Sequence, residues 1–97
     1  MAPTLDALLR ACRTSAKLSQ DALATCIDKR NRFPAYSQTS KSKVLAEVIH
    51  IEQSDTCTFT GEELRIFWRN ALKCLQNADA VTLALLAVLL AHVVPDP

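Results

Sequence analysis

The sequence predicts an all-α fold, a compact bundle of about five helices around an apolar C-terminal helix, and three observations lead to the prediction of helices. Hydrophobic residues make up 49% of the 97 positions, too high a fraction for intrinsic disorder. A single glycine and four prolines leave too few tight turns for an all-β chain. Apolar residues also recur three and four positions apart through most of the chain. We expect residues 1–97 to form one helical domain.

The segment from Asp79 to Val94 is the most apolar part of the chain. It contains no glycine, no proline and, after Asp79, no charged residue. We expect a helix that is capped by Asp79 and stopped by Pro95. At about 1.5 Å per residue it would be roughly 24 Å long. Because a bilayer core is roughly 30 Å thick, we do not expect this helix to cross a membrane.

A helix that is apolar on every side must be covered on every side. Either the other helices surround it at the centre of the bundle, or part of it lies in a homodimer interface. Its alanines, at positions 80, 84, 87 and 91, form one narrow stripe. Leu83, Leu86, Leu90 and Val94 flank the stripe on one side, and Val81, Leu85 and Val88 flank it on the other. The candidate interface residues are Ile66, Leu83, Leu86, Leu90 and Val94.

Two amphipathic helices are expected before residue 31, from about Thr4 to Lys17 and from Ser19 to Arg30. The connection is short, so we expect an antiparallel hairpin in which Cys12 and Cys26 face each other. A disulfide between them is one alternative, and buried thiols in a reducing compartment are the other and the expected one. The four cysteines have no C-x-x-C spacing, so we expect no metal site.

The fragment Leu18 to Ala24, Leu-Ser-Gln-Asp-Ala-Leu-Ala, resembles the opening of the second helix in repressor-type helix-turn-helix domains. The resemblance implies that a recognition helix follows the next turn. Pro34 falls inside that position and would break such a helix. We therefore do not assign the chain to this family.

Two further helices are expected in the middle of the chain. Ser40 is placed to cap one that reaches about Glu52. The next would begin at Gly61 and reach about Asn77. Its start carries the strongest local signal in the sequence, because Thr60 and Glu63 have the spacing of a capping box and Phe59 and Leu64 that of a hydrophobic staple.

The charges are unevenly distributed along the chain. From Arg10 to Lys43 there are eight basic residues and two acidic ones, whereas from Val44 onward there are three basic residues and seven acidic ones. Such a polarised chain favours an acidic partner or head-to-tail self-association.

The segment from Lys29 to Lys43 interleaves basic residues with Phe33 and Tyr36. Single-stranded nucleic acid or a phosphorylated partner would suit this pattern, because cations bind phosphates and rings stack on bases. A solvated loop whose rings pack back on the core is the alternative. Downstream, a basic stripe on the fourth helix has a repeat of about 6 Å, near that of the phosphates in an extended strand. The candidate binding residues are Lys29, Arg30, Arg32, Phe33, Tyr36, Lys41, Lys43, Arg65, Arg69 and Lys73.

No motif for catalysis is present in the sequence. His50 and His92 are far apart, and neither has a cysteine or carboxylate at a metal-binding spacing. We expect no enzymatic activity and no cofactor. No secretory signal is apparent, so an intracellular, by default cytoplasmic, location is expected.

These observations lead to two hypotheses of function. The first is a small non-enzymatic regulatory or accessory protein that acts as a self-associating protein-interaction module, as a homodimer with a protein partner of unknown identity. The second is a protein that binds RNA or another single strand through residues 29–43.

Overall fold

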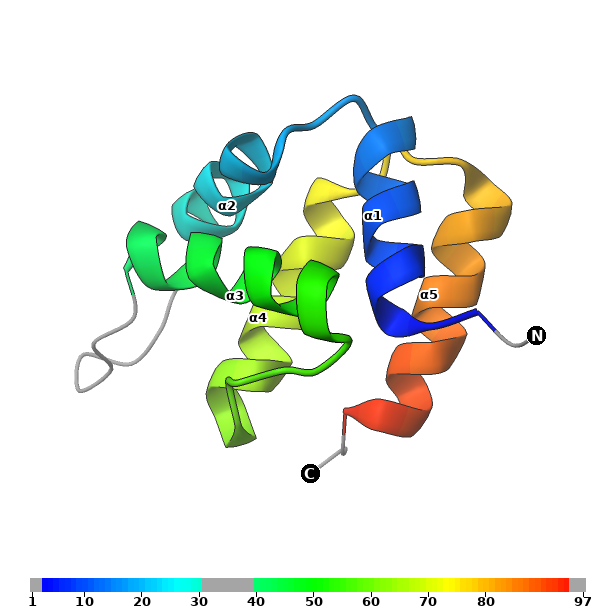
Figure 1. Ribbon diagram of the computed structural model, residues 1–97. Coiled ribbons are helices and arrows are strands. Elements are labelled where there is room, and N and C mark those ends of the chain that lie inside the picture. Colours follow the sequence, from blue (N-terminus) through cyan, green and yellow to red (C-terminus); the bar gives the residue numbers. More distant parts are fainter. Residues whose placement is uncertain (1–2, 31–39, 95–97) are drawn as a thin grey trace.

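The computed structural model describes residues 3–30 and 40–94 of the chain, and it is all-helical in these ranges. It contains five α-helices: α1 (Leu5–Ser15), α2 (Gln20–Lys29), α3 (Lys41–Ser54), α4 (Gly61–Cys74) and α5 (Ala80–Val93) (Figure 1). The predicted all-α fold of five helices is therefore confirmed. The observed ends lie within three residues of the expected ones.

Three helices begin where a predicted cap residue supplies an acceptor for a backbone N–H. The Ser19 hydroxyl accepts from the N–H of Ala22 at 3.0 Å, and the Ser40 hydroxyl accepts from residue 43 at 3.5 Å. The Asp79 carboxylate accepts from both the backbone N–H and the hydroxyl of Thr82. These contacts satisfy donors that the first turn of a helix leaves unpaired.

The predicted capping box at the start of α4 is wrong in one respect. Thr60 is the N-cap residue, but its side chain makes no capping hydrogen bond. Gly61 has a φ of +57°, a left-handed conformation that favours glycine, so the first turn is not regular and does not align the Thr60 hydroxyl with the backbone donors. The Glu47 carboxylate accepts instead from the backbone N–H groups of Thr58 and Phe59 just before the helix.

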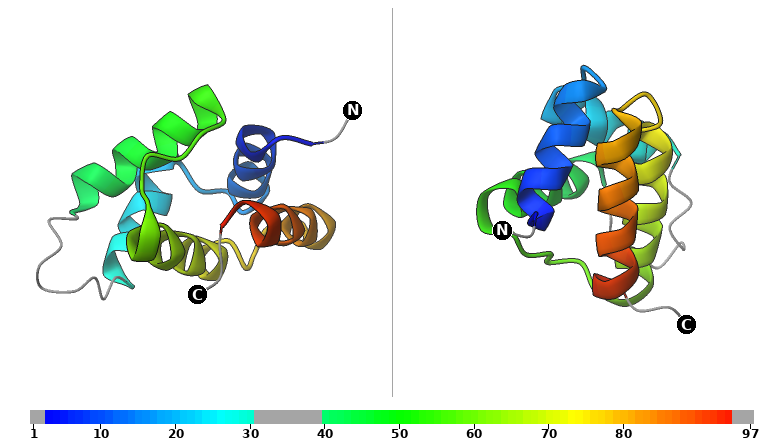
Figure 2. Two further views of the ribbon diagram at one scale, coloured as in Figure 1. Left: turned by 90° about the horizontal axis from the view of Figure 1, so that it is seen from below. Right: turned by 90° about the vertical axis from the view of Figure 1, so that its right-hand side faces the viewer.

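Helix α3 packs across both α1 and α2, while α5 packs on α1 and α4 packs on α2. The two views in Figure 2 show α1 and α5 side by side on one side of the molecule, with α2, α3 and α4 on the other. The expected hairpin of the first two helices is wrong. Lys17 has a φ of +61°, and the chain leaves α1 there so that α3, not α1, covers α2.

The core is formed by one apolar side from each of the five helices. Phe67 is fully buried in it and contacts Phe59 and Trp68 edge to face, at ring-centroid distances of 5.5 and 5.1 Å. Around it the helices contribute the fully buried residues Leu9, Cys12, Leu23, Ile27, Val44, Val48, Ile51, Ala71, Leu75 and Leu86.

Helix α5 lies at the edge of the bundle and not at its centre. Only Leu86 and Leu90 of this helix are buried, and α1 is its principal neighbour. The right-hand view of Figure 2 shows α5 in front, with no other helix over its outer side. The expectation that the bundle surrounds α5 is therefore wrong, because one side of α5 packs on α1 and the core while its opposite side is exposed.

Two buried carboxylates on α3 connect it to neighbouring segments. Glu47, 1% exposed, fixes the segment before α4 through the bonds to Thr58 and Phe59. Glu52, 3% exposed, accepts from the Arg13 Nε and Nη2 atoms at 2.8 and 2.9 Å. Each carboxylate is thus compensated by donors from another part of the chain, as burial of a charge requires.

Candidate functional site

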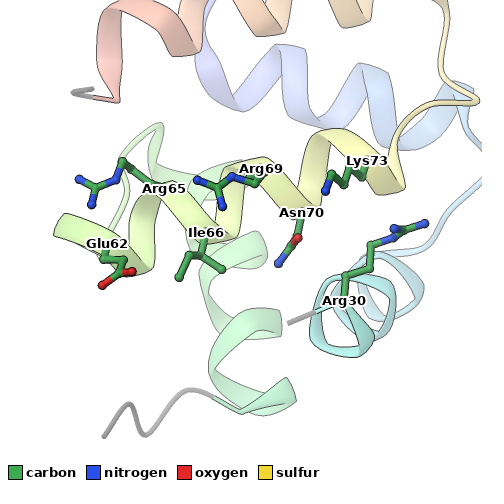
Figure 3. Close-up of a pocket in the computed structure, with 7 residues that line it drawn as sticks. All are labelled: Arg30, Glu62, Arg65, Ile66, Arg69, Asn70 and Lys73. Atoms are coloured by element: carbon green, nitrogen blue, oxygen red, sulfur yellow. The ribbon is translucent and has the colours of Figure 1, made fainter. Parts of the chain in front are cut away.

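A polar groove of about 430 Å³ runs along α4 beside the C-terminal end of α2. We call it the basic groove, since four of the residues that line it are cationic. Figure 3 shows its lining, which consists of Arg30, Glu62, Arg65, Ile66, Arg69, Asn70 and Lys73. All but Arg30 come from α4, where the spacing of three and four residues places them along one side of the helix.

The cations of the basic groove outnumber the one carboxylate in its described lining by four to one. Within residues 3–30 and 40–94, the ion pairs of the structure join Arg10 and Arg13 to Glu52, and Lys41 to Asp21. None of these pairs includes a cation of the groove. Glu62 contributes one carboxylate at the end of the groove nearest the start of α4.

Two uncharged residues complete the groove. Asn70 is 6% exposed, and its amide points in Figure 3 to the side of α4 away from α5. Ile66, which the sequence suggested for a dimer interface, is half-buried next to it. Its position in the groove separates it from the exposed side of α5.

A disulfide between Cys26 and Cys74 joins the two helices that border the basic groove. Their Cα atoms are 6.1 Å apart. Cys74 follows Lys73 directly, and Cys26 lies one helical turn before Arg30, so the bond fixes the two sides of the groove relative to each other. This pairing replaces the predicted alternative of a Cys12 to Cys26 bond, which is wrong because α1 and α2 do not form a hairpin.

The other two cysteines carry free thiols. Cys12 is fully buried and Cys57 is half-buried. Burial is the main cause that raises the pKa of both thiols, so neither is an activated nucleophile. The expectation of four thiols is thus wrong for Cys26 and Cys74. Disulfides persist mainly in oxidising compartments, so the bond counts against the cytoplasmic location, which stays a prediction.

The residues predicted to bind nucleic acid or an acidic partner are only partly brought together. Arg30 lines the basic groove with the three cations of α4, and Lys29 lies beside it, in a hollow that Arg30 also lines. Lys41 and Lys43 lie on α3, and the Lys41 ammonium contacts the Asp21 carboxylate at 3.2 Å. Arg32, Phe33 and Tyr36 lie outside the described residues.

The predicted interface residues of α5 lie mostly on its inner side. Leu86 and Leu90 are buried, and Leu83 and Val94 are partly buried against the core. The exposed large apolar residues are those of the opposite flank, Val81, Leu85 and Val88, together with Val93 near the end of the helix. We call this surface, with its exposed alanines at positions 80, 84, 87 and 91, the outer face of α5.

The outer face of α5 is a second candidate site. Val81, Leu85 and Val88 are 69%, 46% and 60% exposed, and His92 lies on the same side of the helix. Across the described residues, every exposed large apolar side chain belongs to α5. Concentrated apolar exposure of this kind marks an interaction site more often than scattered single residues do.

Neither a metal site nor a membrane span is found in the described part of the chain. No group of three or more histidine, cysteine or acidic side chains there is arranged to hold a metal ion. The helices present are too short or too polar for a transmembrane span.

Sequence reasoning missed several residues that define these sites and the fold around them. Asn70 gave no signal, because a single polar residue on an amphipathic helix is common. For the buried carboxylates of α3, Glu47 and Glu52, the helical repeat did offer an indication. It places Glu47 between Val44 and Ile51 on the apolar side of the helix. The partner of Cys26 required the three-dimensional arrangement.

No protein-family model matches the chain, and neither the curated proteins nor the solved structures include a significant match.

Proposed function

We propose that the protein is a small non-enzymatic interaction module, accessory or regulatory in role, that forms a homodimer through the outer face of α5. The observation that carries this proposal is the confinement of the exposed large apolar side chains to that one helix. Leaving such a surface in water is unfavourable by roughly 25 cal/mol for each Å² that a partner could cover.

The chemistry of the outer face supports a second copy of this chain as the occupant. Val81, Leu85, Val88 and His92 follow the alternating spacing of four and three residues by which two helices pack along a seam. No charged residue occurs between Ala80 and Val93, so two copies would meet without a buried charge. The exposed alanines would let the two helices approach closely.

The overall charge also favours this assembly. The formal net charge of the chain is +1, so two copies repel each other only weakly. A partner with a strongly charged surface would leave those charges desolvated and unpaired against α5. A twofold pair of α5 helices, by contrast, presents the same uncharged surface from both sides.

The substitution Val88→Glu tests the proposal because it places a charge on the outer face without changing the core. We expect the wild type to form dimers in sedimentation equilibrium and the variant to dissociate at least about 100-fold more readily, which corresponds to roughly 3 kcal/mol. Unchanged far-ultraviolet circular dichroism would establish that the variant remains folded.

Ala46→Glu is the matched control, because Ala46 is exposed on α3, on the other side of the molecule. This variant should dimerise like the wild type. A wild-type protein that stays monomeric at all concentrations, or equal dissociation of both variants, would refute the proposal.

A further inference from the structure

We propose that the basic groove binds the phosphate backbone of single-stranded nucleic acid. This inference is independent of the dimer, because Ile66 and Asn70 of the groove point to the side of α4 away from α5. It rests on the arrangement of four cations on two helices, their excess over the single carboxylate in the described lining, and a disulfide that holds the helices together.

The cations of α4 are arranged for a repeating anion and not for a single one. Arg65, Arg69 and Lys73 are four residues apart, so each step advances about 6 Å along the helix axis. Figure 3 shows their charged groups at successive points along α4, without convergence on a common centre. Consecutive phosphates of an extended strand have a similar repeat and could contact one side chain each.

The fourth cation extends the line of charge to a second helix. Arg30 is the C-cap residue of α2, and in Figure 3 it lies across the groove from Lys73. Two guanidinium groups on α4 and one on α2 can each form paired hydrogen bonds to a phosphate, which an ammonium cannot. A strand bound here would pass along α4 and leave past the end of α2.

The excess of positive charge in the basic groove favours binding of an external anion. The ion pairs that Glu52 and Asp21 form within the described residues engage Arg10, Arg13 and Lys41, and none of them engages a cation of the basic groove. Glu62 lies at one end of the groove and leaves a net positive lining. Phosphates would release counterions from this lining and gain affinity at low salt.

Nucleic acid fits the groove better than an acidic protein surface does. A protein interface normally has an apolar centre surrounded by polar residues. The basic groove contains one apolar side chain, Ile66, and its remaining lining is charged or, at Asn70, an amide. An amide can donate to a phosphate or a base and accept from a base, so the lining suits a polar, regularly charged chain.

The disulfide supports the inference because it preorganises the site. The bond between Cys26 and Cys74 lies next to Lys73 and one turn from Arg30. It therefore limits the movement of α2 against α4 and reduces the entropy lost when a ligand contacts both helices.

Fluorescence anisotropy with a labelled oligouridylate of about 12 nucleotides tests the proposal. If four phosphates are contacted, the logarithm of the association constant should fall with the logarithm of salt concentration at a slope of about −3. The affinity would then decrease about 50-fold between roughly 50 and 200 mM salt. Arg69→Gln should weaken binding about tenfold and reduce the slope by about 0.7.

Lys17→Gln is the matched control, because Lys17 is exposed at the other end of α2 and the substitution removes the same charge. It should bind RNA with an affinity within about twofold of the wild type, since distant surface charges are screened. Circular dichroism would verify that both variants are folded.

Three results would overturn the proposal. The first is no binding at about 100 µM protein in low salt. The second is an equal loss of affinity in Arg69→Gln and Lys17→Gln, which would indicate diffuse attraction without a site. The third is equal or tighter binding of a polyglutamate peptide or of a duplex, which would assign the groove to another class of ligand.

Discussion

Glu52 is a buried carboxylate that binds side chains of two other segments of the chain. Its side chain accepts from Arg13 and, at 3.2 Å, from the amide of Gln20, so it connects α3 with both α1 and α2. Arg10 donates to its backbone carbonyl oxygen at 2.6 Å. The hydrogen bonds to Glu52 raise the pKa of the Arg13 guanidinium, which therefore stays charged at every accessible pH. The pair holds together helices that have no hairpin contact of their own.

Glu52→Gln removes the negative charge and keeps the shape of the side chain. We expect it to lower the free energy of unfolding by about 2–3 kcal/mol, because the Arg13 guanidinium loses its ionic acceptor in a largely buried place. Urea denaturation followed by Trp68 fluorescence would measure the change.

The control for Glu52→Gln is Lys41→Gln, which breaks an ion pair between side chains that are 46% and 63% exposed. Such a pair contributes no more than about 0.5 kcal/mol. If both variants were equally stable, Glu52 would not have the structural role that its burial indicates.

At the scale of elements, α5 shows how a helix can be apolar on all sides without being central. One side packs on α1 and the core through Leu86 and Leu90, and the other side is exposed. The start of this helix is fixed by Asp79, whose carboxylate binds Thr82 and whose backbone N–H donates to the Ser15 hydroxyl at 2.9 Å. The cap therefore orients α5 relative to α1.

The Asp79 cap makes the stability of α5 dependent on pH. The hydrogen bond from the Thr82 backbone is the largest cause that lowers the pKa of Asp79, followed by the bond from the Thr82 hydroxyl. A lowered pKa in the folded state means that the ionised carboxylate stabilises the fold above the ordinary pKa of aspartate. This contribution disappears as the pH falls through the folded-state value.

The substitution Asp79→Asn isolates this effect, because asparagine still caps a helix but does not ionise. We expect the wild type to melt at a higher temperature than the variant at pH 7, and the difference to shrink as the pH falls below about 4. Thermal denaturation at several pH values would measure it. A difference that is independent of pH would contradict the assignment.

The positions of the helices could be predicted well from the sequence, whereas the packing of one helix against another could not. Helix periodicity and cap residues such as Ser19, Ser40 and Asp79 act within one or two turns, so the five helices could be located from the sequence alone. The helical periodicity of α5 likewise separated its two apolar flanks. Nothing in the local sequence, however, indicates that the flank of Leu86 is buried and that of Val88 is exposed. That choice depends on the position of α1, and the pairing of Cys26 with Cys74 depends on the packing of α4.

The candidate sites follow the same division. The stripe of Arg65, Arg69 and Lys73 was predictable, because it lies on a single helix and depends only on its repeat. The addition of Arg30 was not predictable as a groove, because it requires α2 and α4 to lie together. Arg32, Phe33 and Tyr36 remain predictions, since they lie outside the described residues.

At the scale of the whole molecule, the two proposed surfaces belong to different parts of the fold. The outer face of α5 lies on the side formed with α1, and the basic groove lies where α4 meets α2. A dimer through α5 would therefore leave the basic groove of each copy accessible, so that one dimer would carry two binding sites. Two linked sites bind a long polymer more tightly than one site alone.

The disulfide is the strongest constraint on this architecture. The cysteines are 48 positions apart, and closing a loop of this length in the unfolded chain corresponds to about 4 kcal/mol of stabilisation in the chain-entropy treatment. We expect reduction, or the double substitution Cys26→Ser and Cys74→Ser, to lower the unfolding free energy by about 2–4 kcal/mol. Urea denaturation with and without a reductant would measure the loss.

Cys57→Ser is the control for this experiment, since Cys57 has a free thiol that is half-buried. Its stability should fall by no more than about 1 kcal/mol and should respond to the reductant as the wild type does. An unfolding midpoint that does not change on reduction would show that the bond is absent in solution or does not stabilise the fold.

In covalent terms the oxidised chain is a ring with two tails. The ring runs from Cys26 to Cys74 and contains α3, all of α4 and the end of α2, whereas α1 and α5 belong to the tails. A force applied to the two ends of the chain would first separate α1 from α5. Further extension would then be limited, because the disulfide keeps the residues of the ring from being pulled out. A single cut in the backbone of the ring would leave two chains that are still joined by the disulfide, and they would separate only after reduction and unfolding.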